Sequence, residues 1–278
     1  MELQITTLIE NQPDDNEELL CEHGLSFYIE ADGKKILFDT GQSGDFMKNA
    51  RSLEKDLNVL DYCILSHGHY DHTGGLERFV REISQLPKLV VGEEFFKAKY
   101  KAIGDGEYKF NGNSFSQEYL NEIKADVLKV REDVMELSEN ILVFHHFKKH
   151  NDFEQINGKF YIKSGDGYIL DDFADEIALG IRTKKGLAVI VGCSHVGIVN
   201  IIKTISDRTQ IPIYAVIGGT HLIHGSEERI GRTIEVFQKM GIQMVAVSHC
   251  TGEDGIQKIQ EGMAMQFVQN NTGHVIRI

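Results

Sequence analysis

The chain carries three histidines and an aspartate within six residues, His67-Gly68-His69-Tyr70-Asp71-His72. In an extended segment alternate residues face the same way, so His67 and His69 can bind one ion. Asp71 and His72 follow as neighbours that point in different directions, which suits a second ion close to the first. Imidazole nitrogens and carboxylate oxygens fit Zn²⁺, and open coordination positions leave room for water. The segment therefore predicts two divalent metal ions, zinc by preference, with iron or manganese as alternatives.

Three further histidines, His195, His221 and His249, follow short apolar runs, as His67 does. A lone histidine in such a place is more often structural than a ligand. Four in the same position favour a shared metal site, because strands of an open α/β sheet present their carboxyl ends to one crevice. The runs are residues 62–65, 187–191, 213–217 and 244–247.

The elements that must position these residues are strands and helices in a mixed order. Residues 3–9 form one apolar run, and residues 25–30 and 35–39 flank the turn signal Asp32-Gly33, which predicts a β-hairpin. After Gly41 the apolar runs precede stretches with helical periodicity, such as Val196/Val199/Ile202 and Ile230/Ile234/Phe237. This order predicts an α/β fold whose sheets are covered by helices.

No linker rich in proline, serine or glycine divides the chain, so we expect a single domain over residues 1–278. The segment from about residue 92 to residue 175 differs in composition from the rest of the chain, because it is charged, rich in Phe and Tyr, and interrupted by glycines. We interpret it as an insertion, either a lid over the site or a solvated excursion. Its acidic run Asp171-Asp172 and Asp175-Glu176 is interpreted as a solvated loop. Its aromatic residues either stack on a substrate ring or pack a small core: Phe95, Phe96, Tyr100, Tyr108 and Phe110.

Composition narrows the class of protein. The 278 residues are 41% hydrophobic and 26% charged, which is typical of a globular protein, and the net charge of −13 disfavours nucleic acids and anionic membranes as partners. No run of 18 apolar residues and no secretory signal is visible. The four cysteines form no Cys-x-x-Cys pair, and we expect a reduced, cytoplasmic protein.

The histidine segment, together with His195, His249 and Asp39-Thr40-Gly41, resembles the metallo-β-lactamase superfamily over most of the chain. The resemblance implies an αβ/βα sandwich of two mixed sheets with helices outside and a dinuclear metal site at one edge. It implies that Asp39 orients a ligand without binding metal itself. By this resemblance one ion is held by His67, His69 and His195, and the other by Asp71, His72 and His249.

One departure from the superfamily pattern concerns the bridging aspartate. The superfamily usually places it at the strand end where this chain has Gly218-Gly219-Thr220-His221. We expect His221 to replace it as a ligand, since imidazole reaches a metal as well as carboxylate does. The alternatives are that one ion binds weakly without the bridge, or that His221 positions substrate.

A closer resemblance is to the 7,8-dihydropterin-6-methyl-4-(β-D-ribofuranosyl)aminobenzene-5′-phosphate synthase group. The reaction of that group displaces pyrophosphate from a pterin methylene. The resemblance also places His23 and His224 near the site. It is carried by motifs from both halves of the chain: His23-Gly24-Leu25-Ser26, Gly192-Cys193-Ser194-His195, residues 218–222 and Ser248-His249-Cys250-Thr251-Gly252.

These observations predict a metal-dependent hydrolase or group-transfer enzyme acting on a small anionic substrate, phosphorylated or pterin-like. Asp71 is the expected catalytic residue, orienting a water molecule and accepting its proton. Alternatives are the synthase reaction, a di-iron redox protein or a non-catalytic binding module. A nucleophilic role for Cys193 or Cys250 is a further alternative to their being small buried residues. The oligomeric state is left open. Basic residues that could attract the substrate are Lys148, Lys149, Arg182, Lys184 and Lys185.

Overall fold

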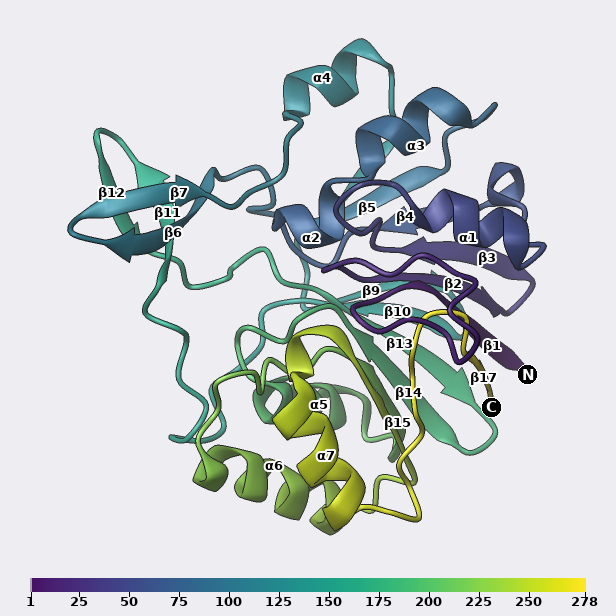
Figure 1. The fold of residues 1–278 in the computed structure, drawn as a ribbon, viewed down its shortest axis with the longest axis vertical. Helices are drawn as coiled ribbons and strands as arrows, with labels where there is room; N and C mark the ends of the chain where they lie inside the picture. Colours follow the sequence, from purple (N-terminus) through teal and green to yellow (C-terminus); the bar gives the residue numbers. More distant parts are fainter. Residues whose placement is uncertain (1) are drawn as a thin grey trace.

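A computed structural model describes residues 2–278, in which two mixed β-sheets pack face to face between outer layers of helices (Figure 1). This arrangement confirms the predicted αβ/βα sandwich. The first sheet runs β17 (Val275–Arg277), β1 (Leu3–Ile9), β2 (Ser26–Ala31), β3 (Lys34–Phe38), β4 (Tyr62–Ile64), β5 (Lys88–Gly92) and β8 (Val127–Val130). The second runs β16 (Met244–Val247), β15 (Ile213–Gly218), β14 (Gly186–Val191), β13 (Ala178–Thr183), β10 (Ile141–Phe144) and β9 (Val134–Ser138).

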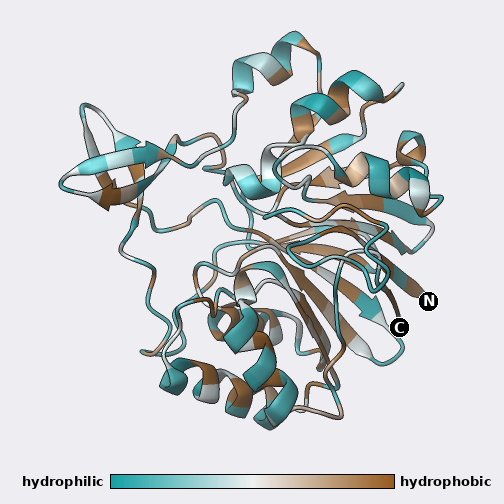
Figure 2. Cartoon of the chain, in the orientation of Figure 1, coloured by the Kyte–Doolittle hydropathy of each residue, from teal (hydrophilic) through white to brown (hydrophobic). Residues whose placement is uncertain are grey.

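The cores lie on both faces of each sheet. Between the sheets, side chains such as Ile5 and Ile29 meet Ile190 and Ile217, all fully buried. Figure 2 shows the hydrophobic strands inside and the hydrophilic faces of the helices outside. Within residues 2–278 no helix combines the length and apolar character needed to cross a membrane. Helices α1 (Phe46–Ser52), α3 (Leu76–Glu82) and α4 (Gln117–Glu122) cover the first sheet, and α5 (Ile198–Thr209), α6 (Glu227–Lys239) and α7 (Glu253–Gly262) cover the second.

The local sequence signals place most of these elements. The hairpin is confirmed, because β2 and β3 are antiparallel and Ala31 pairs with Lys34. Asp32 and Gly33 both have positive φ, 53° and 69°, as a tight two-residue turn requires. The five apolar runs that begin at residues 3, 62, 187, 213 and 244 coincide with β1, β4, β14, β15 and β16. The two periodic stretches form α5 and α6.

The predicted insertion at about 92–175 consists of two excursions rather than one. Strands β6 (Lys99–Gly104) and β7 (Glu107–Phe110) pair with β11 (Phe160–Ser164) and β12 (Gly167–Leu170) in a third sheet, which stands away from the sandwich (Figure 1). The chain between them supplies β8, β9 and β10 to the main sheets. Tyr108 stacks on Tyr168 at 4.0 Å between ring centroids, and Tyr100 packs against Phe110, so these rings form the core of the third sheet itself. Phe95 and Phe96 instead pack with Phe115 in the core of the first sheet. The role of the third sheet as a lid stays a prediction.

Candidate metal centre

The strand ends converge as the sequence predicts. Strands β14, β15 and β16 are parallel neighbours, and β4 of the facing sheet ends at the same edge. The rings of His67 and His195 lie 4.8 Å apart between centroids, and those of His195 and His221 lie 4.4 Å apart. His72 and His249 are separated by 4.9 Å. Histidines from four strand ends therefore share one site.

Backbone strain accompanies this convergence. Four non-glycine residues at the strand ends, Asp39, Ser194, His221 and His249, have φ between 48° and 61°. Left-handed backbone is costly for such residues and is kept where the surroundings enforce it, often at functional sites.

A first group of donor atoms consists of His67, His69 and His195, whose ring nitrogens lie within 4.8 Å of one another. His67 Nε2 is 3.1 Å from His69 Nδ1 and 3.2 Å from His195 Nε2. Burial lowers the pKa of all three rings well below the usual value, so they are neutral. Neutral, buried imidazoles whose nitrogens face one another fit a metal ion, because metal ligands must be deprotonated.

A second group consists of Asp71, His72, His249 and a residue that sequence reasoning did not assign to the metal, Cys193. His72 Nε2 lies 3.1 Å from Cys193 Sγ, and His249 Nε2 lies 3.4 Å from Asp71 Oδ2. His249 Nε2 is buried and makes no hydrogen bond within residues 2–278, as a metal-binding nitrogen would be. The rings of His67 and His72 are 4.4 Å apart, so the two groups are adjacent.

Asp39 lies behind both groups, where the resemblance implied a supporting residue. Its Oδ2 accepts hydrogen bonds from His72 Nδ1 at 2.6 Å and from Ser66 Oγ at 2.7 Å. Ser66 Oγ in turn lies 2.9 Å from His67 Nδ1. These contacts hold the Nδ1 sides of both rings and leave each Nε2 facing the donor groups. Burial alone would lower the pKa of His72, but Asp39 and Asp71 raise it to about 9.

Buried carboxylates hold the backbone of the metal-site loops. Glu10 accepts a hydrogen bond from the His249 amide at 3.2 Å, and Glu176 accepts one from the His195 amide at 2.8 Å. Burial raises the pKa of each carboxyl to about 7. Asp175 accepts the Gly68 amide at 2.7 Å.

The acidic run at 171–176 is therefore not a solvated loop, which corrects the sequence interpretation. Asp171, Asp175 and Glu176 are buried, and only Asp172 is exposed. The two aspartates share one ion-pair partner, Lys99, whose Nζ lies 2.7 Å from Asp171 and 2.8 Å from Asp175. Sequence spacing alone does not reveal this partner, because it lies more than 70 residues away.

The strand end without the bridging aspartate is closely packed. Gly218 has φ of 112°, and a Cβ there would strike the Val191 carbonyl oxygen, so no side chain fits. His221 follows, but it lies outside both donor groups. Its ring packs against His195, and burial lowers its pKa to about 4. Its role as a ligand stays a prediction, and its position also fits the alternative of contacting substrate.

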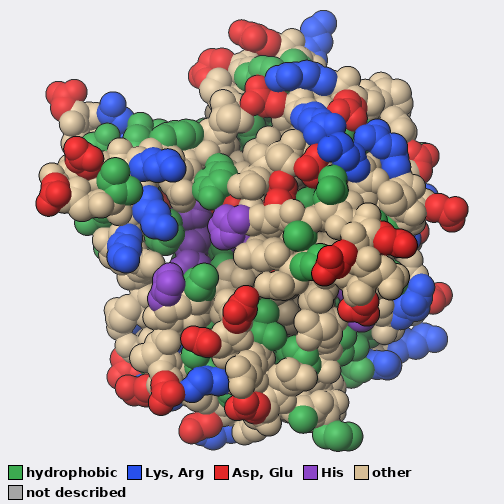
Figure 3. All heavy atoms as spheres, in the orientation of Figure 1, with side chains coloured by type: hydrophobic (Ala, Val, Ile, Leu, Met, Phe, Trp, Pro, Cys, Tyr) green, Lys and Arg blue, Asp and Glu red, His purple; other side chains and the backbone are tan. Residues whose placement is uncertain are grey.

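A cavity of about 150 Å³ opens over the donor groups, between the sandwich and the third sheet. Figure 3 shows histidines inside this hollow and basic side chains on the side of the third sheet. His23 reaches it and lies 3.2 Å from Asp71 Oδ2. None of the five basic residues named from the sequence is among the lining residues of the described chain; the third sheet supplies Lys101 instead. The lining is His23, His69, Tyr70, Asp71, Lys101, Asn111, Asn157, Phe160, Cys193, His195, His221, Ile223, His224 and Cys250.

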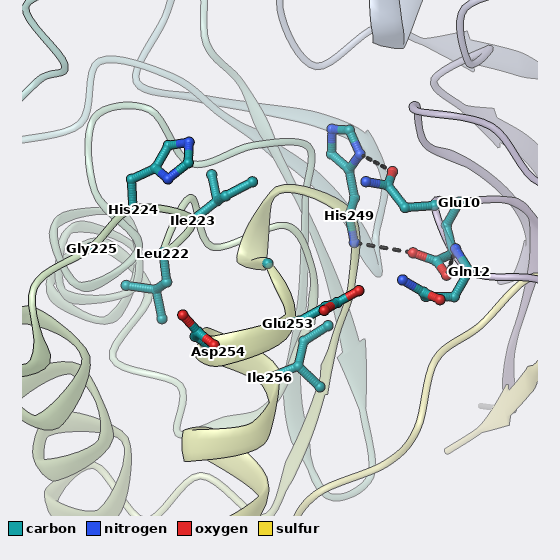
Figure 4. Close-up of a pocket in the computed structure, with 13 residues that line it drawn as sticks. Glu10, Gln12, Leu222, Ile223, His224, Gly225, His249, Glu253, Asp254 and Ile256 are labelled. Atoms are coloured by element: carbon teal, nitrogen blue, oxygen red, sulfur yellow. Dashed lines mark hydrogen bonds between the residues drawn. The ribbon is translucent and has the colours of Figure 1, made fainter.

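A second cavity of about 400 Å³ lies on the other side of His249 (Figure 4). Its wall includes Glu10, Glu253 and Asp254, and it is therefore acidic. The His249 amide points at Glu10, and His249 Nδ1 lies 2.8 Å from Asn11 Oδ1. This contact holds the ring so that Nε2 faces Asp71.

Comparison with known proteins defines the class. A sequence profile of the metallo-beta-lactamase superfamily matches residues 20–190, and the chain belongs to this superfamily. It is 32% identical, over 99% of its length and 96% of the relative's, to the 7,8-dihydropterin-6-methyl-4-(beta-D-ribofuranosyl)-aminobenzene-5'-phosphate synthase of Methanocaldococcus jannaschii. An uncharacterized protein of the same archaeon is 29% identical over 94% of the chain and 95% of that protein. Among solved structures, Tm1679, named a metal-dependent hydrolase of the beta-lactamase superfamily, has a TM-score of 0.86 and 28% identity over 99% of both chains.

Proposed function

We propose that the chain is a metal-dependent enzyme that hydrolyses, or transfers a group from, a small anionic substrate. The observation that carries the proposal is the pair of adjacent, buried donor groups beneath one cavity. Two divalent ions bound there would acidify a water molecule and polarise a phosphoryl or acyl oxygen. Zinc is the ion that this set of imidazole and carboxylate donors suits best.

The role proposed for Asp71 follows from its contacts. Its carboxylate faces the cavity and lies beside His23, His72 and His249. Burial alone would raise its pKa, but His72 and the close imidazoles of His23 and His249 hold it well below the usual value. The carboxylate is therefore ionised, and it can orient a water molecule and receive its proton as well as bind metal.

Recognition of an anion is assigned to the wall of the cavity. Lys101 projects from β6 with its Nζ 5.9 Å from the centre of the Phe160 ring. It forms no ion pair within residues 2–278, so its charge is free to meet a phosphate at the cavity mouth. The net charge of −13 would repel an anionic substrate, so binding needs a local positive charge, and Lys101 supplies one.

A second candidate function is that of the synthase, a transferase whose substrate is a dihydropterin pyrophosphate. It is favoured by the 32% identity to the archaeal synthase over nearly the full length of both chains. The Phe160 ring in the cavity wall offers a flat apolar surface for an aromatic substrate ring.

A substrate panel tests the proposal and separates its two forms. The zinc-loaded protein is assayed on phosphate mono- and diesters, and separately on a 6-hydroxymethyl-dihydropterin pyrophosphate with ribofuranosylaminobenzene phosphate. We expect the protein to convert either the phosphate esters or the pterin substrate pair. We expect Asp71→Ala to lower kcat by about 100-fold or more, which is the effect of losing an acid–base group. The exposed His146, outside the cavity, supplies the control variant His146→Asn. Full activity in Asp71→Ala would contradict the proposed mechanism.

A further inference from the structure

Cys193 lies at the second donor group, although the proposed function gives it no task. It follows β14 and Gly192 and precedes His195 by two residues. Its side chain is buried, with Sγ 3.1 Å from His72 Nε2. The same turn therefore directs His195 to the first group and Cys193 to the second.

The second group is short of a donor unless the cysteine belongs to it. The end of β15 offers Gly218 and Gly219, which have no side chain to give. Asp71, His72 and His249 alone make three protein donors, and Cys193 makes four, within 4.8 Å of one another. Four nitrogen, oxygen and sulfur donors are what a tetrahedral zinc ion takes. The unpartnered, buried Nε2 of His249 marks the same place independently of the cysteine.

We propose that the Cys193 thiolate is a ligand of the second ion and replaces the carboxylate that β15 lacks. On binding, the S–H bond breaks, its proton leaves to solvent, and a sulfur–metal bond forms with no change of oxidation state. A thiolate makes the second site selective for zinc, iron(II) or cobalt(II) over manganese or magnesium, which prefer oxygen donors. The inference rests on the proposed function, because it needs an ion to bind at the second group.

A different role for the same contacts is a nucleophilic cysteine. His72 Nε2 faces Cys193 Sγ while His72 Nδ1 is held by Asp39, which is the order of a Cys-His-Asp nucleophile. The two roles differ in a measurable way, because only a ligand perturbs the electronic spectrum of the bound metal.

Cobalt(II) substitution tests the assignment. Metal-free protein is titrated with cobalt(II), and absorption in the near ultraviolet is followed, where sulfur-to-cobalt charge transfer appears. The control variant is Cys250→Ser, because Cys250 is also buried in the cavity wall but lies outside both donor groups. We expect the charge-transfer band in the wild type and in Cys250→Ser, and its loss in Cys193→Ser.

Additional measurements keep each outcome decisive. Cys193→Asp, which offers a carboxylate in the same place, is expected to bind two equivalents of cobalt without the band, and circular dichroism checks that each variant is folded. Two equivalents of cobalt in the wild type without a charge-transfer band would overturn the cysteine assignment and leave the proposed function standing. Failure of the wild type to bind cobalt or zinc at all would overturn both. A band that persists in Cys193→Ser would also overturn the assignment.

Discussion

Protons compete with metal ions more strongly at the second donor group than at the first. His72 has a pKa raised to about 9 in the metal-free protein, whereas His67, His69 and His195 have pKa values well below the usual one. At neutral pH, metal binding at the second group must therefore displace a proton from His72, and one from the Cys193 thiol that is proposed to bind, whereas the first group releases none.

The affinity of the second site is accordingly expected to rise by about tenfold or more per pH unit between about pH 6 and pH 8. The affinity of the first site is expected to change little over that range. Competition with a chromophoric chelator at several pH values gives both constants. Equal pH dependence at the two sites would contradict the assigned charge states.

Asp39 is predicted to act through the rings that it holds. In Asp39→Asn, an amide faces His72 Nδ1 in place of a carboxylate oxygen. If the amide donates to Nδ1, the proton of the ring moves to Nε2, the nitrogen that faces the metal group. We expect metal affinity to fall by roughly 10- to 100-fold, as for other residues that support a ligand. Unchanged affinity, measured by the same competition titration, would show that Asp39 does not set the ring orientation.

At the scale of single residues, the donors whose spacing in the chain is short were predictable. Residues 67–72 were recognisable as ligands from the sequence. His67 and His69 alternate and so face the same way, whereas Asp71 and His72 are adjacent and point toward a second, neighbouring position. Lys101 was missed because it is an ordinary lysine on an insertion strand, and only the pairing of β6 with β11 brings it to the cavity. Cys193 carried a weak signal, its place beside His195 after a strand, and the missing aspartate could have drawn attention to it.

At the scale of elements, one buried ion network joins the third sheet to the metal loop. Lys99, at the start of β6, pairs with Asp171 and Asp175, and Asp175 also accepts the Gly68 amide. Through this network the inserted segment that carries the third sheet holds the backbone at Gly68, between His67 and His69.

Removal of the lysine is predicted to leave two buried carboxylates without their cation. Lys99→Met should therefore lower the free energy of unfolding by about 3–5 kcal/mol. Lys101→Met, two residues along the same strand and exposed, should change it by about 0.5 kcal/mol or less. Urea denaturation of both variants is the measurement, and equal effects would contradict the role given to the network.

The strands and helices around the site were predictable because each has a signal in its own local sequence. The Asp32-Gly33 turn fixes the first hairpin, and each apolar run before a histidine became a strand. The boundaries of the insertion were not predictable, because β8, β9 and β10 are only four or five residues long, and β8 and β9 carry a charged residue among their apolar ones. Their membership of the main sheets depends on partners far away in the chain.

At the scale of the whole molecule, the sandwich accounts for why metal-donor residues up to 182 positions apart, His67 to His249, form one site. His67 follows the carboxyl end of β4 in the first sheet, and His249 follows the carboxyl end of β16 in the second. Because the two sheets pack face to face, these strand ends lie on the same side of the sandwich. Loops at this edge are held by Glu10, Asp39 and Glu176, so the donor positions are prepared before any ion binds.

The central claim is that this edge holds two ions, and metal content per chain tests it most directly. Protein purified without added metal is analysed as wild type and as His221→Ala. His221 lies outside both donor groups, and the Cys193 ligand proposed above takes the place that the sequence assigned to His221. We therefore predict two equivalents of metal, zinc by preference, in both proteins. Two equivalents falling to one in the variant would make His221 a ligand. One equivalent or none in the wild type would contradict the account.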